Sequence, residues 1–460
     1  TLMRSSAASD VYKRQKIYQG EIRDRIASFG VDVVDAGMVD NLVKAGEAAE
    51  YLKKQDVDIV FLYVATYALS STVLPVARKL KVPVIILNLQ PVARLDYETF
   101  NKSGDSGRMT GIWLEHCQAC SVPEIACVFN RTGIRYEIVT GYLKDEEAWK
   151  DIQAWTEAAG AVRALCNNRM GILGHYYCGM LDVYTDITKQ SAVFGTHFEM
   201  LEMCELKKYR DSVTFEEVEE KIREFGEAFD IVPECEPAEI ERAARTSIAL
   251  DRIIKHHNLS SMAYYYEGEG GNDYENMVTS VIAGNTLLTS NNIPVAGECE
   301  VKNAQAMKIM AELGAGGSFS EFYLMDFEDD IVMLGHDGPA HFAIAQGRVK
   351  LVPLPVYHGK PGKGLSIQMS VKYGPVTLLS VVEGADGISL LVAEGESVPG
   401  PVLQIGNTNS RYRFSIGAKR FMNEWSKYGP AHHCAIGVGH IAGKIEKLAF
   451  LLNISVNIVC

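Results

Sequence analysis

Apolar and polar positions along residues 16–168 alternate between helical periodicity and short apolar runs. The spacing predicts three helices, over 17–29, 41–54 and 71–79. The apolar runs predict three strands, over 31–34, 58–64 and 82–87, the last two buried on both faces. Strands separated by helices are typical of a parallel sheet covered by helices, so this region is predicted to be an N-terminal α/β domain.

The same pattern starts again in a second region, residues 169–313. Its first predicted strand is 169–174, a later strand is 262–266, and a long helix covers 301–313. After residue 314 helices become scarce. Short apolar or alternating runs separated by turns then predict an antiparallel β-rich, barrel-like domain over 314–460.

The fold class is therefore predicted to be α/β, with two doubly wound α/β domains followed by an antiparallel β-rich domain. Residues 1–15 have no apolar periodicity, and we interpret them as a leader foreign to the fold. The first strand of the N-terminal domain is then missing from the pattern.

Composition restricts the class of protein. A chain of 460 residues suits two or three domains. Its net charge of −13, without a long Lys/Arg block, argues against a nucleic-acid partner. No apolar run is long enough to span a bilayer and no signal peptide is recognisable, so the protein is predicted to be cytoplasmic, without a membrane partner. In that setting the ten cysteines, including the pair in Cys117-Gln-Ala-Cys120, are predicted to be free thiols.

Four short segments in the second half carry side chains suited to a hard divalent cation. They are Ala-Gly-Glu298, Phe-Ser-Glu321-Phe-Tyr, Leu-Gly-His336 and Gly-Pro-Ala-His432-His433. Two carboxylates and two imidazoles suit Mn²⁺ or Mg²⁺ with water positions left open. The same carboxylates can also move protons, so the segments predict metal-assisted acid/base chemistry.

Each candidate in these segments has a structural alternative. Glu300 competes with Glu298, and His341 competes with His336. His432 and His433 are adjacent, and neighbouring side chains on a strand point to opposite faces, so only one of them is expected to bind a cation. Glu321 lies among aromatic residues, and this apolar setting predicts a raised pKa.

Two further features complete the candidate site. Asp337 directly follows His336 and is expected to orient its imidazole. Gln118, Met180 and Tyr266 stand in polar or aromatic segments that can line a pocket. A glycine-rich stretch at 437–443 resembles a dinucleotide fingerprint only loosely, and we interpret it as a helix start.

With these motifs in their order, the sequence resembles the L-arabinose isomerase and L-fucose isomerase superfamily and is closer to the L-arabinose isomerases. The resemblance implies Mn²⁺, with Mg²⁺ or Co²⁺ as alternatives, held by residues matching Glu298, Glu321, His336 and His433. It implies isomerisation of a small sugar from aldose to ketose, with Glu298 and Glu321 transferring protons. It also implies a homotrimer or homohexamer whose active site forms between subunits.

The resemblance extends to the pocket. Gln118 matches a substrate-contacting glutamine, and Met180 falls near another pocket residue; Tyr266 and His432 are further substrate-binding candidates. L-Arabinose isomerases usually read Ser-His-Met after Leu-Gly, whereas this chain reads His336-Asp-Gly-Pro. Two alternatives stay open: an L-fucose-type or other sugar isomerase or epimerase, and a sugar-binding protein of the same fold without turnover.

Overall fold

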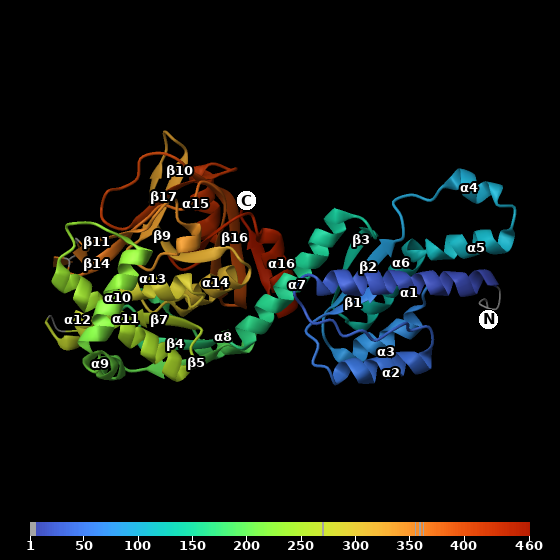
Figure 1. Cartoon of the computed structure of the whole chain (residues 1–460). Helices are drawn as coiled ribbons and strands as arrows, with labels where there is room; N and C mark the ends of the chain where they lie inside the picture. The colour runs from blue at the N-terminus through green and yellow to red at the C-terminus, as the bar shows by residue number, and fades with distance from the viewer. Residues whose placement is uncertain (1–5, 269–270, 355, 358–359, 362) are drawn as a thin grey trace. The chain divides into compact units, whose positions relative to one another are not determined.

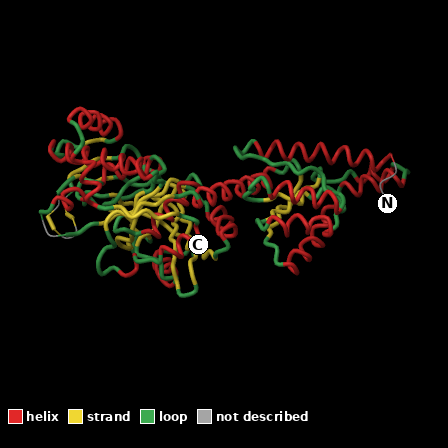
Figure 2. Tube along the Cα trace, turned by 90° about the horizontal axis from the view of Figure 1, so that it is seen from below, coloured by secondary structure: helices red, strands yellow, loops and turns green. Residues whose placement is uncertain are grey.

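The computed structural model of the chain describes residues 6–268, 271–354, 356–357, 360–361 and 363–460. The contacts within the chain form two compact units, residues 1–159 and 160–460. Both units combine helices with strands (Figure 2). The domain boundaries predicted at 168/169 and 313/314 stay predictions.

The first unit is built on a parallel sheet with the strand order β1-β2-β3 (Figure 1). Its described strands are β1 (Val60–Tyr63), β2 (Val84–Gln90) and β3 (Tyr136–Tyr142). Its helices are α1 (Ser6–Ala27), α2 (Leu42–Lys53), α3 (Ser70–Leu80), α4 (Tyr97–Lys102), α5 (Ser106–Glu115), α6 (Gln118–Thr132) and the start of α7 (Glu146–Cys166). The parallel sheet and the predicted helices over 41–54 and 71–79 are therefore confirmed.

Three local predictions in this unit are wrong. Residues 31–34 form no strand, and β1 is half-buried along its whole length instead of buried on both faces. Helix α1 begins at Ser6, so it includes most of the predicted leader, whose residues 1–5 lie outside the described part of the chain.

The buried face of α1 contains a polar residue, so the sequence pattern did not reveal the full length of this helix. Val11, Gln15, Ile22 and Ile26 recur at helical spacing and are all buried. Gln15 is only 1% exposed, and its amide donates a hydrogen bond to the backbone oxygen of Ala65 at 3.1 Å. A glutamine satisfied in this way can be buried, although a hydropathy pattern counts it as a solvent-facing position.

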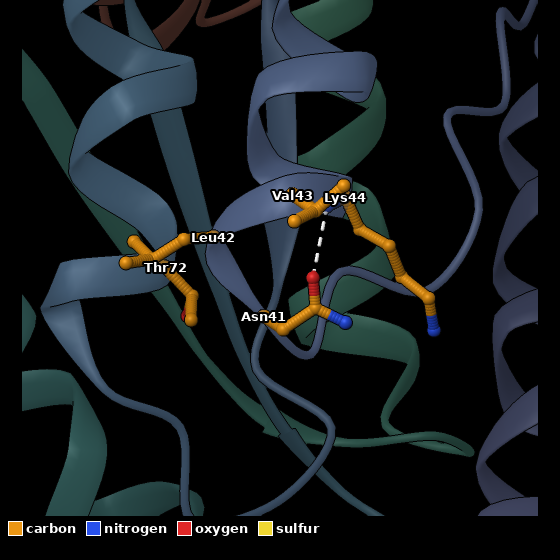
Figure 3. A pocket seen from close by; sticks show the side chains of 5 residues that line it. All are labelled: Asn41, Leu42, Val43, Lys44 and Thr72. Atoms are coloured by element: carbon orange, nitrogen blue, oxygen red, sulfur yellow. Dashed lines mark hydrogen bonds between the residues drawn. The ribbon is translucent and has the colours of Figure 1, made fainter.

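Helix α2 begins with a side-chain cap. Asn41 stands just before it, and its side-chain oxygen accepts a hydrogen bond from the backbone N–H of Lys44 at 3.0 Å (Figure 3). This cap satisfies one of the backbone donors that the first turn leaves without a partner. Leu42, Val43 and Thr72 line a shallow surface hollow beside this cap, between α2 and α3.

The second unit begins with a parallel sheet in the order β5-β4-β7-β8. Its strands are β4 (Arg169–Gly174), β5 (His197–Leu201), β7 (Ser261–Tyr265) and β8 (Val295–Ala296). Its helices are η1 (Leu181–Val183), α8 (Ile187–Phe194), α9 (Met203–Asp211), α10 (Phe215–Ala228), α11 (Pro237–His257), α12 (Asp273–Val278), α13 (Ile282–Ser290) and α14 (Val301–Glu312). The strands and the long helix predicted for this region are confirmed.

The remaining chain closes a barrel. Six described strands, in the order β15-β18-β9-β10-β17-β16, form antiparallel pairs, and β16 pairs again with β15. They are β9 (Gly316–Asp326), β10 (Ile331–His336), β15 (Gly374–Gly384), β16 (Gly387–Val398), β17 (Thr408–Phe414) and β18 (His433–Val438). The smaller elements are β6 (Asp230–Ile231), η2 (Phe342–Ile344), β11 (Lys350–Pro353), β12 (Val356–Tyr357), β13 (Lys360–Pro361), β14 (Leu365–Gln368), α15 (Ala418–Lys427), α16 (Ala442–Leu452) and β19 (Ser455–Ile458). The predicted fold class, α/β followed by an antiparallel barrel, is confirmed.

Helix α14 joins the two parts of the second unit. It packs against β9, β15 and β18 of the barrel and against β7 and β8 of the parallel sheet (Figure 1). Its first ten residues, 301–310, are buried on every side. His336 at the end of β10 faces Glu298, and His433 at the start of β18 faces Glu300, so the four sequence motifs meet near the start of α14.

The cysteines and the hydropathy of the helices bear on two predictions from composition. All ten cysteines are among the described residues and none forms a disulfide, as predicted. Within the described residues, no helix combines the length and the hydropathy required to cross a bilayer.

Candidate functional site

Four neighbouring elements bring the motif residues together. Glu298 follows β8, Glu321 lies on β9, His336 ends β10 and His433 begins β18. Glu321 and His433 are direct partners across the antiparallel pair β9–β18. Directly opposite residues point to the same face of a sheet, so the register alone places these two side chains side by side. With His432, these residues form what we term the barrel cluster.

Glu298 is held by an unusual backbone. Its φ is 53° and that of Cys299 is 58°, so two consecutive non-glycine residues adopt the left-handed conformation. Hydrogen bonds fix this turn: Cys299 N–H donates to Tyr264 O at 2.9 Å, and Glu300 N–H donates to Gly297 O at 2.9 Å. Strained backbone of this kind persists where the surrounding structure holds it, and it occurs often at functional sites.

Three imidazoles point one nitrogen towards Glu298. Nε2 of His432 lies 3.5 Å from a carboxylate oxygen of Glu298, Nε2 of His433 lies at 3.8 Å, and Nε2 of His336 lies at 3.9 Å. Nε2 of His432 also lies 4.0 Å from Glu321. The carboxylates and imidazoles form two groups in which all ligand atoms lie within 4.8 Å of one another: Glu298 with His432 and His433, and Glu321 with His336 and His433.

The other nitrogen of each imidazole faces a carboxylate. Nδ1 of His433 lies 2.5 Å from Glu300. Nδ1 of His432 lies 2.6 Å from Asp182. A carboxylate at Nδ1 places the proton there and leaves Nε2 free to bind a cation, which is the usual arrangement of metal-binding histidines.

His336 follows the same arrangement, as predicted from the neighbouring aspartate. Its Nδ1 lies 2.9 Å from a carboxylate oxygen of Asp337. The backbone N–H of Gly338 also lies 3.0 Å from this Nδ1. If Nδ1 carries the proton, it donates to Asp337 and cannot accept from Gly338. If Nδ1 instead accepts from Gly338, the proton of the neutral ring lies on Nε2. Only the first state gives His336 a free lone pair towards Glu298.

Several atoms that face this space have no hydrogen-bond partner among the described residues. They are one carboxylate oxygen of Glu298 and the Nε2 atoms of His432 and His433, all of them shielded from solvent. A buried polar atom without a partner costs roughly 1–3 kcal/mol, so such atoms are rare in proteins unless a ligand, ion or water satisfies them. Carboxylate and imidazole donors left bare together fit a divalent cation such as Mn²⁺.

Burial shifts the pKa values in the cluster. It raises the pKa of Glu321, against the opposing effect of the nearby imidazoles, and it raises the pKa of Glu300 to about 8. Burial, reinforced by nearby positive charge, lowers the pKa of His433 well below its usual value. For His432 burial also acts downwards, but contacts with two carboxylates outweigh it and raise the pKa to about 9. The raised pKa predicted for Glu321 is therefore confirmed.

Two of the three predicted pocket residues belong to the same unit as the cluster. Met180 directly precedes η1, which carries Asp182, the partner of His432. Tyr266 follows β7, and its ring lies 5.8 Å from that of His175 in the loop after β4. Gln118 lies in the first unit, where it starts α6, is 1% exposed and donates to the backbone oxygen of Glu115 at 2.8 Å. Substrate binding by these residues stays a prediction.

Both adjacent histidines face Glu298, and the expectation that only one of them binds a cation stays a prediction. Strand β18 begins at His433, so His432 lies outside the alternating pattern of the strand. Asp182 holds His432 from the side, accepting hydrogen bonds from its backbone N–H at 2.9 Å and from its Nδ1. Asp182 itself was missed, because it lies 250 residues from its partner and no local signal marks it.

The structure also separates the competing residues. Glu300 is 1% exposed and lies behind His433, so it supports the imidazole instead of replacing Glu298. His341 lies outside the two ligand groups, and its Nδ1 accepts a hydrogen bond from the backbone N–H of Ala343.

The known proteins that resemble this chain are distant relatives, and all of those named below are sugar isomerases. The chain is 23% identical over 301 residues to a sulfoquinovose isomerase from Alkalicoccus urumqiensis, covering 64% of this chain and 66% of that protein. It is 19% identical over 379 residues to an L-arabinose isomerase from Klebsiella pneumoniae, covering 79% of this chain and 72% of that protein. It is 22% identical over 338 residues to an L-arabinose isomerase from Geobacillus kaustophilus, covering 70% of this chain and 66% of that protein.

The chain is thus similar to sulfoquinovose isomerase and to L-arabinose isomerases, at identities of 19–23%. No protein-family profile matches it, so this relationship rests on the curated relatives. The match spans slightly less than two thirds of the sulfoquinovose isomerase and of the Geobacillus protein. Each alignment extends over 301 residues or more. The resemblance to L-arabinose isomerases that the four motifs indicated is therefore confirmed.

Proposed function

We propose that the chain is a metal-dependent aldose–ketose isomerase that acts on a small open-chain sugar, as in conversion of L-arabinose to L-ribulose. The observation that carries this proposal is the convergence of imidazole Nε2 atoms on Glu298, where buried atoms of His432, His433 and Glu298 itself have no hydrogen-bond partner among the described residues. The named relatives, all sugar isomerases, support the same reaction class.

Glu298, Glu321, His336 and His433 are the proposed cation ligands. A divalent cation, Mn²⁺ in this proposal and Mg²⁺ or Co²⁺ as alternatives, supplies positive charge that favours negative charge developing on two adjacent sugar oxygens. Glu300 and Asp337 keep the Nδ1 proton of their histidines in place and so direct the lone pairs of Nε2 inward.

The two cluster glutamates are the proposed acid/base pair. One takes the proton from C2 of the aldose while O1 gains a proton, which produces an enediol. The other assists proton transfer from O2, and C1 is then protonated to give the ketose. The raised pKa of Glu321 brings this carboxylate closer to the range in which it can accept and return a proton near neutral pH.

A screen on metal-stripped protein tests this function. Mn²⁺ is added back, and ketose is measured by chromatography from L-arabinose, L-fucose, D-galactose and sulfoquinovose, the last because of the relative with that name. Metal-dependent ketose from one sugar is expected. Sugar binding without ketose from any of them would contradict the isomerase proposal and favour a binding protein of the same fold.

A second measurement separates the two routes to the ketose. In D₂O the enediol route incorporates solvent deuterium at C1, because the proton passes through a glutamate that exchanges with solvent. A hydride shift from C2 to C1 incorporates none. We expect deuterium at C1, and its absence would remove the two glutamates from their proposed role.

The proposed assembly is a homotrimer or homohexamer in which the active site lies at a subunit interface. Gln118, Met180 and Tyr266 are proposed to contact the sugar, with His432. This part of the proposal rests on the resemblance to L-arabinose isomerases. Sedimentation velocity measures the oligomeric state, and a monomer with full activity would contradict an interfacial site.

A further inference from the structure

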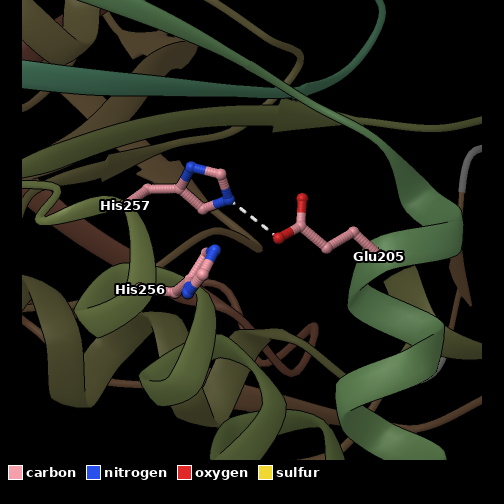
Figure 4. Close-up of side chains that lie close together, drawn as sticks. All are labelled: Glu205, His256 and His257. Carbon is pink, nitrogen blue, oxygen red and sulfur yellow. Dashed lines mark hydrogen bonds and ion pairs between the residues drawn. The ribbon is translucent and has the colours of Figure 1, made fainter.

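A second group of histidines and glutamates lies in the same unit, away from the barrel strands. Helix α11 ends with His256 and His257, and Glu205 lies in the first turn of α9. Ligand atoms of these three side chains all lie within 4.8 Å of one another. Figure 4 shows the two imidazoles and the carboxylate turned towards a common space. We term this group the helix-end cluster.

The backbone at the end of α11 is firmly held. Asn258 adopts the left-handed conformation and its N–H donates to backbone oxygens of the last turn. The backbone oxygen of His257 accepts a hydrogen bond from Nε of Arg169 at 3.0 Å. The two histidines are therefore presented by a fixed helix end, and not by a mobile loop.

His257 is oriented like a metal-binding histidine. Its Nε2 lies 2.8 Å from Glu205, on the side of the common space. Its Nδ1 faces Glu199 at 3.6 Å, and Glu199 is held in turn by Nη2 of Arg169 at 2.8 Å. A carboxylate behind an imidazole helps to orient the ring, as the carboxylates behind the barrel histidines do.

His256 supplies the second nitrogen. Its side chain is exposed and makes no hydrogen bond to another described residue, so none has to be broken when the ring binds a cation. Its ring lies 4.8 Å from that of His257, centroid to centroid. Adjacent positions on a helix are about 100° apart around the axis, so side chains at such positions usually diverge. Here both rings lie near the same carboxylate.

We propose that Glu205, His256 and His257 form a second divalent-cation site, selective for an imidazole-preferring ion such as Zn²⁺. Two imidazoles and one carboxylate are a common zinc ligand set, with water in the open position. Ligand atoms on a tetrahedral Zn²⁺ are about 3.4 Å apart, given bonds of about 2.0–2.2 Å. The Glu205–His257 contact, now 2.8 Å, therefore needs to open by about 0.6 Å, while the exposed His256 ring moves in.

The bound ion would link the start of α9 to the end of α11 and would not touch the barrel cluster. This proposal is independent of the isomerase function, because it uses no residue of the barrel cluster. An ordinary hydrogen bond between His257 and Glu205 is the competing explanation, and it predicts no affinity for Zn²⁺ and no contribution from His256.

The experiment counts zinc on the full-length chain. Metal-stripped wild type, His256→Gln and Glu205→Gln are equilibrated with buffered Zn²⁺, and bound metal per chain is measured by elemental analysis. His197→Gln is the matched control, because His197 lies near Glu199 but outside the three ligands. We expect each of the two cluster variants to bind one Zn²⁺ fewer than wild type, and the control to bind as many as wild type.

Equal zinc in wild type and in both cluster variants would overturn the proposal, and so would equal losses in all three variants. Folding is checked by circular dichroism without metal, where His256→Gln is expected to match wild type because the side chain is exposed. Thermal unfolding gives a second measurement. Zinc should raise the midpoint of wild type more than that of His256→Gln, since a ligand that binds only the folded state stabilises it.

Discussion

The barrel cluster and the helix-end cluster use the same residue types in different surroundings. In the barrel cluster, acceptor atoms of Glu298 and His433 are shielded from solvent and have no partner within the described residues. In the helix-end cluster, Glu205 and His257 are part-exposed and bond to each other at 2.8 Å. Bare buried atoms are costly without a ligand, whereas satisfied, partly exposed atoms are stable alone. The difference teaches that the proposed cation would satisfy atoms that are otherwise bare in the first cluster, whereas in the second it would join side chains that already satisfy each other.

The largest expected effect is in the barrel cluster. Glu321→Gln should abolish turnover and leave the fold nearly unchanged, because it removes a base and a ligand charge with little change in volume. Ketose formation with Mn²⁺ measures activity, and circular dichroism measures folding. Glu328→Gln, on the exposed turn after β9, is the control and should retain full activity. Normal turnover in Glu321→Gln would remove this residue from the mechanism.

Loss of an imidazole should act on cation binding. His433→Ala is expected to weaken Mn²⁺ binding strongly, since it removes a proposed ligand whose Nε2 lies 3.8 Å from Glu298. Titration calorimetry on metal-stripped protein measures the affinity. His440→Ala, at an exposed position after β18, should bind Mn²⁺ like wild type. An unchanged affinity in His433→Ala would transfer the role to His432 or to a different site.

A smaller effect on Mn²⁺ affinity is expected for Glu300, the carboxylate that contacts Nδ1 of His433. Glu300→Gln can still accept the Nδ1 hydrogen bond of His433, but it cannot ionise when a cation binds to the imidazole, so Mn²⁺ affinity should fall by about 10- to 100-fold. Glu312→Gln at the other end of α14 is the control, because Glu312 pairs with Lys308 outside the cluster. Equal affinities in both variants would mean that Glu300 only fills space in the core.

The smallest effect is expected in the helix-end cluster without metal. Glu205→Gln should lower the free energy of unfolding by about 0–1 kcal/mol, because a part-exposed contact with His257 contributes little. Urea denaturation in the presence of a chelator measures this change. A much larger loss would show that this contact is needed for folding, and the contrast between the two clusters would then disappear.

The elements were predictable where one face of a helix or strand is apolar. Helix α2 lies within the predicted residues 41–54, and α3 covers the predicted residues 71–79. Prediction failed in α1, where Gln15 is buried by a hydrogen bond to Ala65, a partner 50 residues away. Local periodicity cannot register a polar side chain that a distant backbone atom satisfies.

For the site, the sequence alone determined the residue types, their order and the reaction class that these motifs resemble. Only the tertiary structure decided which atoms face one another. The register of β9 and β18 sets Glu321 beside His433, and η1 brings Asp182 to His432 across 250 residues. The physical reason is that a ligand set depends on the direction of each lone pair, and these directions come from backbone turns and distant hydrogen bonds that no local pattern encodes.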